Sequence, residues 1–476
     1  MFKRVLIANR GEIALRVIKA CRALGVETVA IYSEADAASP HLAEADLTVC
    51  VGPGPSARSY LNQKAILQAA EQTGCQAIHP GYGFLSENAL FATRCAQQKL
   101  TFIGPSPTAL RLMGDKAQAR ATMASYGVTG VPGSAGLVHS VEEAVAAAEA
   151  VGYPVLLKAT AGGGGKGMRV CRAPEDLPRA FEQASVEALK AFGDGGLYLE
   201  RFVEGGRHIE FQVLGDRYGR VIHLGERECS TQRSNQKVIE EAPSPGVTAE
   251  QRATLGARIC EVLRQIGYVG AGTVELLRGP DGALYFMEMN TRLQVEHPVT
   301  ELITGVDLVS WQLRVAAGQP LTVRQEEVTL SGHAIECRLN AEDATQGFRP
   351  SPGLITAFEA PEEWRYRLAG PVRLDTHVRS GYRVPTLYDS MLGKLIVHAP
   401  TRHEAIEALR EALALVRVEG VPTTIDLHRY LLNSAEFRSG QYSTASMGEV
   451  MRAFADSRGS RGSHGSHGSD VAQEKR

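Results

Sequence analysis

Two polar residues near the middle of the chain have the types and spacing to hold a cation. Glu288 and Asn290 lie at the end of an expected strand over residues 283–289, and positions two apart share one face of a strand. A second expected strand covers residues 270–277, and the turn sequence Gly279-Pro280-Asp281-Gly282 joins the two strands. The sequence therefore predicts both side chains on one face of a β-hairpin.

The residue expected to face them on the first strand is Glu275. If the turn is the two-residue Asp281-Gly282, Glu275 lies directly across from Glu288; a four-residue loop moves it to the diagonal, still on the same face. Neighbouring carboxylates repel each other, and Mg²⁺ removes the conflict because it takes oxygen ligands from one or two carboxylates together with substrate phosphates. We predict a metal site at this hairpin; the alternative is an exposed face whose carboxylates are hydrated.

The segment after the hairpin, residues 291–298, is dense in groups that bind anions and move protons. Arg292, Glu296 and His297 lie close together in it. Beside a metal pair, an arginine and a carboxylate could bind an anionic substrate and transfer a proton. The alternative is a polar surface loop. His297 precedes a proline and is predicted to be structural rather than catalytic.

A glycine-rich segment at residues 162–167 contains a single residue with a side chain, Lys166. Such a backbone can approach phosphates closely and direct several N–H groups at them. Residue 160 is Thr and Gly167 follows the lysine, so the Walker A pattern G-x-x-x-x-G-K-[ST] fails. Lys158 and Lys116, upstream of the loop, favour a polyphosphate clamp over the alternative of a flexible linker.

Alternating strands and helices open the chain and must position these groups. The segment Asn9-Arg10-Gly11-Glu12-Ile13-Ala14 follows the first strand in place of G-x-G-x-x-G, which excludes the NAD fingerprint. The alternation predicts an α/β fold that begins with a doubly wound parallel sheet. We expect a helix over 12–23, ended by Gly25, and strands near 4–8, 28–32, 47–51, 76–79 and 101–103.

Two further sections and a tail follow. From Gly114 we expect a helix over 141–150 and strands over 154–158, 196–203 and 207–214, and a mixed α and β section begins near Gly332. Residues 457–469 contain only Ser, Gly, Arg and His and are predicted to be disordered. The predicted divisions are 1–113, 114–330, 331–450 and a disordered tail at 457–476.

Length and composition limit the class of protein. The chain has 476 residues, enough for about three domains. Its net charge is −2, from 51 basic and 53 acidic residues, which argues against a dedicated nucleic-acid or membrane-surface binder. No apolar run is long enough to span a membrane and no signal peptide is expected. The eight cysteines form no C-x-x-C pair, which argues against a zinc ribbon, and a reducing cytoplasm is the predicted compartment.

In this order, the motifs resemble those of the ATP-grasp superfamily, and specifically of the biotin carboxylase family. The resemblance covers residues 1 to about 450. The matching segments are 7–14, 79–88, 113–116, 162–170, 226–230, 236–237, 288–298, 333–343 and 388–391.

The resemblance implies three domains and a reaction. An N-terminal doubly wound domain, an ATP-grasp domain with a Gly-rich lid at about 131–203 and a C-terminal mixed α+β domain would form the site. ATP and bicarbonate would carboxylate N1′ of biotin carried on a separate protein, with Mg²⁺ or Mn²⁺ at two sites. The chain lacks the Met-Lys-Met triplet of a carrier domain, so it resembles a free-standing subunit of the acetyl-CoA carboxylase type, which serves fatty acid synthesis. The implied partners are a biotin carboxyl carrier protein, carboxyltransferase subunits and a second copy in a homodimer.

The same resemblance implies roles for individual residues. The nucleotide would contact Lys116, Lys158, Gly164, Gly165, His208, Gln232 and Asn235, and its adenine would be read at Glu200, Arg201, Phe202 and Val203. The metal ligands would be Glu275, Glu288 and Asn290. Bicarbonate would be held by Lys237, Arg292 and Val295, with Glu296 as general base and Arg338 facing biotin. Glu296 could serve as the base if the site raises its basicity.

Two positions depart from the family pattern. Asn235 stands where histidine is common, and it can still form a hydrogen bond but carries no charge. Arg201 stands where lysine is common, a mild change if the backbone reads adenine there. Three alternatives stay open: a subunit of a propionyl-CoA or pyruvate carboxylase, an ATP-grasp ligase that passes an acyl phosphate to an amine, and a non-catalytic nucleotide-binding scaffold.

Overall fold

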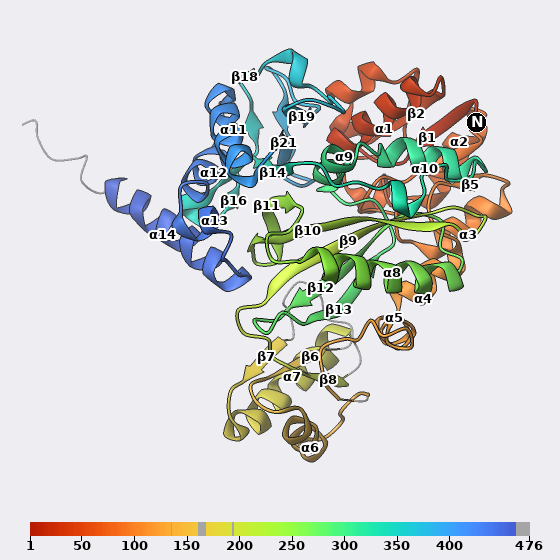
Figure 1. The fold of residues 1–476 in the computed structure, drawn as a ribbon. Coiled ribbons are helices and arrows are strands. Elements are labelled where there is room, and N and C mark those ends of the chain that lie inside the picture. Colours follow the sequence, from red (N-terminus) through yellow and green to blue (C-terminus); the bar gives the residue numbers. More distant parts are fainter. Residues whose placement is uncertain (135, 160–167, 193–194, 463–476) are drawn as a thin grey trace, which may run out of the picture.

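The N-terminal part is a five-stranded parallel sheet with helices on both faces (Figure 1). The computed structural model describes residues 1–134, 136–159, 168–192 and 195–462. In sheet order the strands are β3 (Leu47–Cys50), β2 (Glu27–Tyr32), β1 (Arg4–Ile7), β4 (Ala77–His79) and β5 (Thr101–Phe102). The helices of this part are α1 (Gly11–Ala23), α2 (Gln63–Gln72), α3 (Ala89–Gln97) and α4 (Pro107–Gly114). The predicted doubly wound sheet is confirmed.

Alternate residues of β1 explain the two helical layers. Val5 and Ile7 are buried with residues of α1, whereas Leu6 is buried with residues of α2 and α3. A parallel strand covered on both faces is apolar where it is buried, as β1 is at residues 5–7. Gly25, just after α1, has a φ of +67° and ends the helix as predicted.

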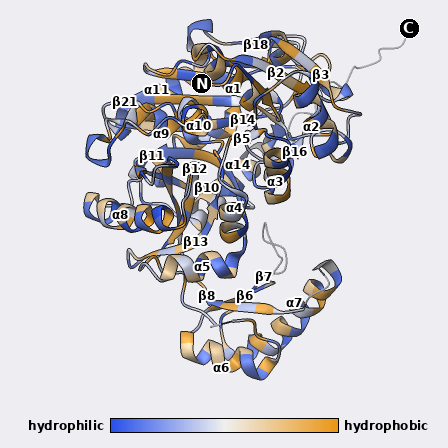
Figure 2. Ribbon diagram, turned by 90° about the vertical axis from the view of Figure 1, so that its right-hand side faces the viewer, coloured by the Kyte–Doolittle hydropathy of each residue, from blue (hydrophilic) through white to orange (hydrophobic). Residues whose placement is uncertain are grey.

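The middle and C-terminal parts of the chain share one antiparallel sheet of eight strands. In sheet order these are β13 (Leu284–Asn290), β12 (Gly270–Arg278), β9 (Arg207–Gly215), β10 (Val221–Arg233), β11 (Gln236–Ala242), β14 (His333–Asn340), β21 (Met391–Ala399) and β19 (Val372–Thr376). Figure 2 shows α8 (Ala249–Gln265) alternating between hydrophobic and hydrophilic residues. The sequence did not predict that β14, from the third section, continues the sheet by pairing with β11.

A smaller sheet stands away from this body (Figure 1). Its antiparallel strands are β7 (Met168–Cys171), β6 (Val155–Ala159) and β8 (Leu197–Arg201), in that order. Two helices, α6 (Val141–Val151) and α7 (Leu177–Phe192), pack on it around their own hydrophobic core. The glycine-rich segment 162–167 lies outside the described residues. Helix α5 (Lys116–Ala124) precedes this small sheet in the chain.

The β12–β13 hairpin brings Glu275 opposite Glu288 as predicted, but by a different route. Near the turn, Leu276 pairs with Phe286, which is one residue out of the register that a two-residue turn requires. A β-bulge then leaves Met287 as the extra residue on β13 and restores the pairing of the two glutamates. Neither the two-residue turn nor the four-residue loop is therefore observed, because a loop of intermediate length and a bulge compensate each other.

Helices cover the large sheet and close the chain. They are α9 (His297–Thr304), α10 (Leu308–Ala316), α11 (Arg402–Leu415), α12 (Ile425–Leu431), α13 (Ala435–Ser439) and α14 (Thr444–Gly462). Three short strand pairs complete the C-terminal part: β15 (Glu342–Asp343) with β16 (Arg349–Pro350), β17 (Gly353–Leu354) with β20 (Arg383–Val384), and β18 (Ala357–Glu359) with β22 (Arg417–Glu419). Within the described ranges, none of the helices has the length and apolarity needed to cross a membrane.

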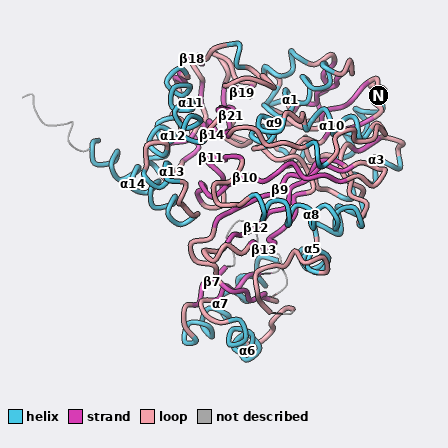
Figure 3. The backbone as a smooth tube through the Cα atoms, viewed as in Figure 1, coloured by secondary structure: helices cyan, strands magenta, loops and turns pink. Residues whose placement is uncertain are grey.

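Helix α14 corrects the predicted start of the disordered tail. Residues 457–462 are helical, whereas the predicted disorder began at 457 (Figure 3). Each residue added to an existing helix gains a backbone hydrogen bond without a new nucleation cost. A helix anchored by buried Met447 and Met451 can therefore continue into a polar sequence. The rest of the predicted tail, 463–476, is outside the described residues.

Candidate active site

Five charged side chains from four strands and the start of one helix meet on the large sheet. They are Glu210 on β9, Lys237 on β11, Glu275 on β12, Arg338 on β14, and Glu296 just before α9. Lys237 Nζ lies 2.5 Å from Glu210 Oε2, 2.5 Å from Glu296 Oε1 and 3.4 Å from Glu275 Oε1. Burial opposes the charge of Lys237, but the carboxylates outweigh it and raise its pKa well above the usual value.

Glu296 is held between two cations. Its Oε1 accepts a hydrogen bond from Lys237, and its Oε2 accepts one from Arg338 Nη2 at 3.0 Å. Burial alone would raise the pKa of this carboxyl, but Lys237, Arg338 and Arg227 outweigh burial and hold it well below its usual range. The condition that the site raises the basicity of Glu296 is not met while both cations contact it, because the groups that position it also stabilise its ionised form.

Arg338 has a second carboxylate partner that the sequence did not single out. Its Nε lies 2.6 Å and its Nη2 2.5 Å from Glu240 Oε1. Glu240, on β11, is completely buried. The guanidinium of Arg338 is therefore fixed from two sides, by Glu240 and by Glu296.

A completely buried arginine, Arg227 on β10, ties the cluster together. Its Nε lies 2.6 Å from Glu210 Oε1. Its Nη1 donates to Gln212 at 2.7 Å and to Thr300 at 2.9 Å, and its Nη2 donates to Gln294 at 3.0 Å. Such a charge is tolerated in the interior only when it is paired and hydrogen-bonded, so Arg227 and its partners stabilise one arrangement.

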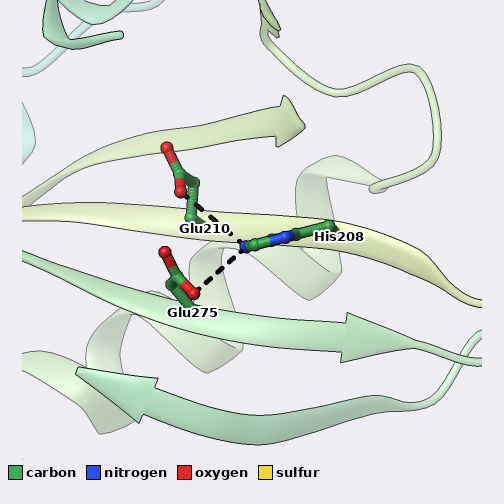
Figure 4. Close-up of side chains that lie close together, drawn as sticks. All are labelled: His208, Glu210 and Glu275. Carbon is green, nitrogen blue, oxygen red and sulfur yellow. Dashed lines mark ion pairs between the residues drawn. The ribbon is translucent and has the colours of Figure 1, made fainter. Parts of the chain in front are cut away.

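His208, Glu210 and Glu275 bring ligand atoms within 4.8 Å of one another (Figure 4). His208 Nε2 lies 3.4 Å from Glu275 Oε2 and 3.9 Å from Glu210 Oε2. Burial disfavours the charged imidazole, but Glu275 outweighs burial and raises the pKa of His208. Lys237 already supplies a positive charge to both carboxylates.

The hairpin face fits the predicted metal. Glu288 is the more open carboxylate, with a side chain 43% exposed and Oε2 3.6 Å from Lys116 Nζ. Asn290 Oδ1 accepts from Arg292 at 2.9 Å, and its buried Nδ2 has no hydrogen-bond partner among the residues that the structure describes. Two carboxylates directly across from each other and an amide oxygen, beside an open lysine, are donors that suit Mg²⁺ or Mn²⁺ with a phosphate.

Arg292 is anchored to the N-terminal part of the chain. Its Nε lies 2.7 Å from Glu87 Oε2, and Glu87 Oε1 accepts from the Thr291 N–H at 2.9 Å. The sequence placed Glu87 in a matching segment without giving it a role. The contact attaches the end of β13 to the parallel sheet domain.

One predicted phosphate residue, Lys158, meets the predicted adenine residues at the small sheet. Lys158 and Arg120 both form ion pairs with the buried side chain of Glu200. Burial would raise the pKa of Glu200, but these two cations outweigh it and lower the pKa. The N–H groups of Arg201 and Phe202 donate to backbone carbonyls at 2.8 Å, and Val203 follows them. Gly164 and Gly165 lie outside the described residues.

Two of the three other predicted nucleotide residues lie together. Gln232 Nε2 is 3.3 Å from His208 Nδ1. Asn235 instead lies at the exposed tip of the turn between β10 and β11. Ser234 and Asn235 have φ values of +48° and +65°, which fits a two-residue hairpin turn and suits asparagine.

Val295 joins the site through its backbone. Its carbonyl accepts a hydrogen bond from Lys394 Nζ at 2.8 Å. Lys394 is completely buried on β21 and also lies 3.3 Å from Glu12 Oε1 of α1. The peptide between Val295 and Glu296 is therefore fixed by a lysine from the C-terminal strands.

Three family models match consecutive parts of the chain. They describe the N-terminal domain of biotin carboxylase over residues 1–110, the ATP-binding domain of the carbamoyl-phosphate synthase L chain over 115–324, and the C-terminal domain of biotin carboxylase over 336–449. The chloroplastic biotin carboxylase 2 of Populus trichocarpa is 52% identical over 444 residues, which cover 93% of this chain and 83% of that protein. The biotin carboxylase of Nostoc sp. is 51% identical over 450 residues, 94% of this chain and 99% of that protein.

The chain belongs to the biotin carboxylase family. A solved biotin carboxylase domain is similar along almost its whole length: that of the 2-oxoglutarate carboxylase of Hydrogenobacter thermophilus, a dimer in complex with MgADP, ADP and bicarbonate. It is 49% identical, with a TM-score of 0.88, and the match covers 95% of this chain and 99% of that one. Biotin carboxylases are ATP-grasp ligases, so the predicted fold class and enzyme class are confirmed.

Sequence reasoning missed several groups of this biotin carboxylase site: Glu87, Glu210, Arg227, Glu240, Gln294 and Lys394. Gln294 illustrates their function, since it accepts from Arg227 and donates to Glu275 Oε1 at 2.9 Å. One signal was available. A charged residue between apolar neighbours in a strand, such as Glu210 or Lys394, must find a buried partner if the strand is covered.

Proposed function

We propose that this biotin carboxylase uses ATP and bicarbonate to carboxylate N1′ of biotin carried on a separate protein. The observation that supports it most is the position of Glu296. This carboxylate is buried between Lys237 and Arg338, at the end of the hairpin that carries Glu288 and Asn290. A base, an anion-binding pair and a set of metal-ligating groups are thereby adjacent.

Activation of bicarbonate is the first step. Lys237, Arg292 and the Val295 backbone hold the anion, and its oxygens take over hydrogen bonds that Glu296 now receives. Released from part of this contact, Glu296 becomes a stronger base and accepts the bicarbonate proton. The carbonate oxygen attacks the γ-phosphate in line, which yields ADP and carboxyphosphate.

The nucleotide is held on the other side of the hairpin. Lys116 and Lys158 contact its phosphates, Gly164 and Gly165 cover them, and the backbone of 200–203 reads adenine. His208, Gln232 and Asn235 approach the ribose and phosphates. Glu275, Glu288 and Asn290 would hold Mg²⁺ or Mn²⁺ at two sites, and the metal supplies charge that offsets the developing charge on the phosphoryl group.

Transfer to biotin is the second step. Carboxyphosphate breaks down to CO₂ and phosphate, and the phosphate takes the N1′ proton of biotin. The nitrogen then attacks CO₂. Arg338 donates to the ureido oxygen, on which negative charge develops, and thus acts as an oxyanion-stabilising group.

The acceptor and the partners complete the proposal. We propose a cytoplasmic, homodimeric subunit that serves a biotin carboxyl carrier protein and an acetyl-CoA carboxyltransferase, and so supplies malonyl-CoA for fatty acid synthesis. Transferases for propionyl-CoA or pyruvate are the alternatives. Co-purification of the tagged chain with its native carrier and transferase, followed by assay with each acyl-CoA and keto acid, tests this. Carboxylation of acetyl-CoA supports the assignment, and product formed only from another acceptor rejects it.

Bicarbonate-dependent ATP hydrolysis tests the reaction itself. The purified chain with Mg²⁺ should form ADP only when bicarbonate is present, and free biotin should stimulate the rate. Arg338→Ala should lose more biotin carboxylation than bicarbonate-dependent ATP hydrolysis, while Arg58→Ala, at an exposed site, should leave both unchanged. Phosphate release that requires an amine acceptor and ignores bicarbonate would reject the proposal in favour of another ATP-grasp ligase.

A further inference from the structure

Two carboxyl groups behind Arg338 face each other with most of their oxygens unpaired. Glu240 on β11 and Glu336 on β14 are directly opposite in the strand register, and both are completely buried. Glu240 Oε1 accepts from Arg338. Glu240 Oε2 and both oxygens of Glu336 have no hydrogen-bond partner within the described part of the chain.

The surroundings supply too little positive charge for two carboxylates. Arg338 on β14 and Lys394 on β21 favour ionisation of Glu336, whereas Glu240 on β11 and Glu296 at the start of α9 oppose it. Lys394 already donates to the Val295 carbonyl. Apolar residues of this face pack around the pair: Ala242, Val299, Ile303, Ala334 and Ile396. The next charged group along the face, Arg373 on β19, lies beyond Ile396 in the register and pairs with Glu301 and Asp375.

On the opposite face of β14, the charged groups His333, Glu241 and Arg402 pair with one another. There Ile335, Cys337 and Leu339 are buried in a hydrophobic core with residues of α11 and α12. Side chains directly opposite on antiparallel strands have Cβ atoms about 4.5–5.5 Å apart, so the two carboxyls interact strongly. Burial is the first cause that raises the pKa of Glu336 well above its usual value, and it raises that of Glu240 to about 7.

A buried carboxylate without hydrogen bonds takes up a proton instead of staying ionised, and two adjacent carboxyls commonly share one. We propose that Glu240 and Glu336 hold one proton between them and present a single negative charge to Arg338. Glu240 carries the charge, because it contacts the guanidinium, and Glu336 carries the proton. Both are positioning residues: they keep Arg338 at Glu296 without a second charge that would draw it away. Only the consequence for biotin carboxylation rests on the proposed function.

Infrared difference spectroscopy at neutral pH tests the shared proton. The spectrum of the wild type minus that of Glu336→Gln should show the carbonyl band of one protonated carboxylic acid. The spectrum of the wild type minus that of Glu240→Gln should show the same band, because the remaining glutamate then ionises beside Arg338. Glu71→Gln, an exposed control, should show only carboxylate bands. Carboxylate bands alone in the Glu336→Gln difference spectrum would overturn the proposal.

The ratio of biotin carboxylation to bicarbonate-dependent ATP hydrolysis tests the positioning. Glu336→Gln copies the neutral acid and should keep the ratio within about twofold, whereas Glu240→Gln removes a charged hydrogen-bond partner of Arg338 and should lower it by about tenfold. Equal losses in the two variants would show that Glu336 is ionised in the wild type and would overturn the assignment.

The two measurements separate this proposal from the proposed function. The infrared result needs no turnover: an acid band in a chain that never carboxylates biotin rejects the function and keeps the shared proton. Full activity without the acid band rejects the shared proton and keeps the proposed function. If Glu240→Gln fails to fold, Glu336→Gln alone still decides the question through its difference spectrum.

Discussion

The bicarbonate side and the nucleotide side of the site are built in different ways. Lys237 and Arg338 have side chains 11% and 17% exposed, and buried carboxylates contact both. Lys116 and Lys158 have side chains 53% and 34% exposed, although the buried Glu200 also contacts Lys158. The first set is organised before any substrate arrives, which is how fixed charges stabilise a transition state most effectively. The second set is open to a polyphosphate that brings its own charge.

On the bicarbonate side, we expect the largest loss of activity when the general base is replaced. We expect Glu296→Gln to lower bicarbonate-dependent kcat by about 10³-fold, within the range of general-base catalysis, because the amide keeps the shape and cannot accept the proton. Initial rates of ADP formation at saturating bicarbonate measure this. A kcat within about threefold of the wild type would remove Glu296 as the base.

The metal-ligating hairpin lies between the two sides. Glu288→Gln should lower metal-dependent turnover by about 10²–10³-fold, because it weakens the charge available to the phosphoryl group. The matched control, Glu71→Gln, removes a carboxylate from an exposed helical position and should have no effect. Titration of the rate with Mg²⁺ and Mn²⁺ checks the assignment, and a wild-type metal response in Glu288→Gln contradicts it.

On the open side we expect a smaller effect that falls mainly on binding. Lys158→Met should raise KM for ATP by about tenfold, the value of one hydrogen bond to a charged group, with less change in kcat. Lys64→Met, at an exposed position of α2, is the control. A large fall in kcat with an unchanged KM would mean that this side is as organised as the other.

Glu241, the neighbour of Glu240 on β11, makes the stability of the protein depend on pH. Burial would raise the pKa of Glu241, but His333 and Arg402 outweigh it and lower the pKa to about 2. A lowered carboxyl pKa adds stability above the unfolded value of about 4.5, and this stability is lost as the pH falls toward 2. The effect is on the order of 3 kcal/mol.

Denaturant unfolding measures this difference. The free energy of unfolding of the wild type should fall between pH 4.5 and 2 by more than that of Glu241→Gln, which has no group to titrate there. The same acid dependence in the two proteins would contradict the assigned pairing of Glu241 with His333 and Arg402.

Features set by local sequence patterns could be predicted from the sequence, whereas features that depend on contacts between distant strands could not. The strands and helices of the parallel sheet follow from periodicity and turn residues. The bulge at Met287 does not, because only the three-dimensional register reveals it. Arg227 and Glu240 were missed for a similar reason: their function depends on partners brought close by the order of strands in the eight-stranded sheet.

The path of one oxygen atom tests the central claim, that this site activates bicarbonate as the nucleophile toward ATP. ATP hydrolysis by the wild type in ¹⁸O-labelled bicarbonate and unlabelled water should place one ¹⁸O atom in each phosphate released, because the bond formed to phosphorus comes from bicarbonate. Mass spectrometry of the phosphate reads the result. Phosphate whose new oxygen comes only from water would contradict the account.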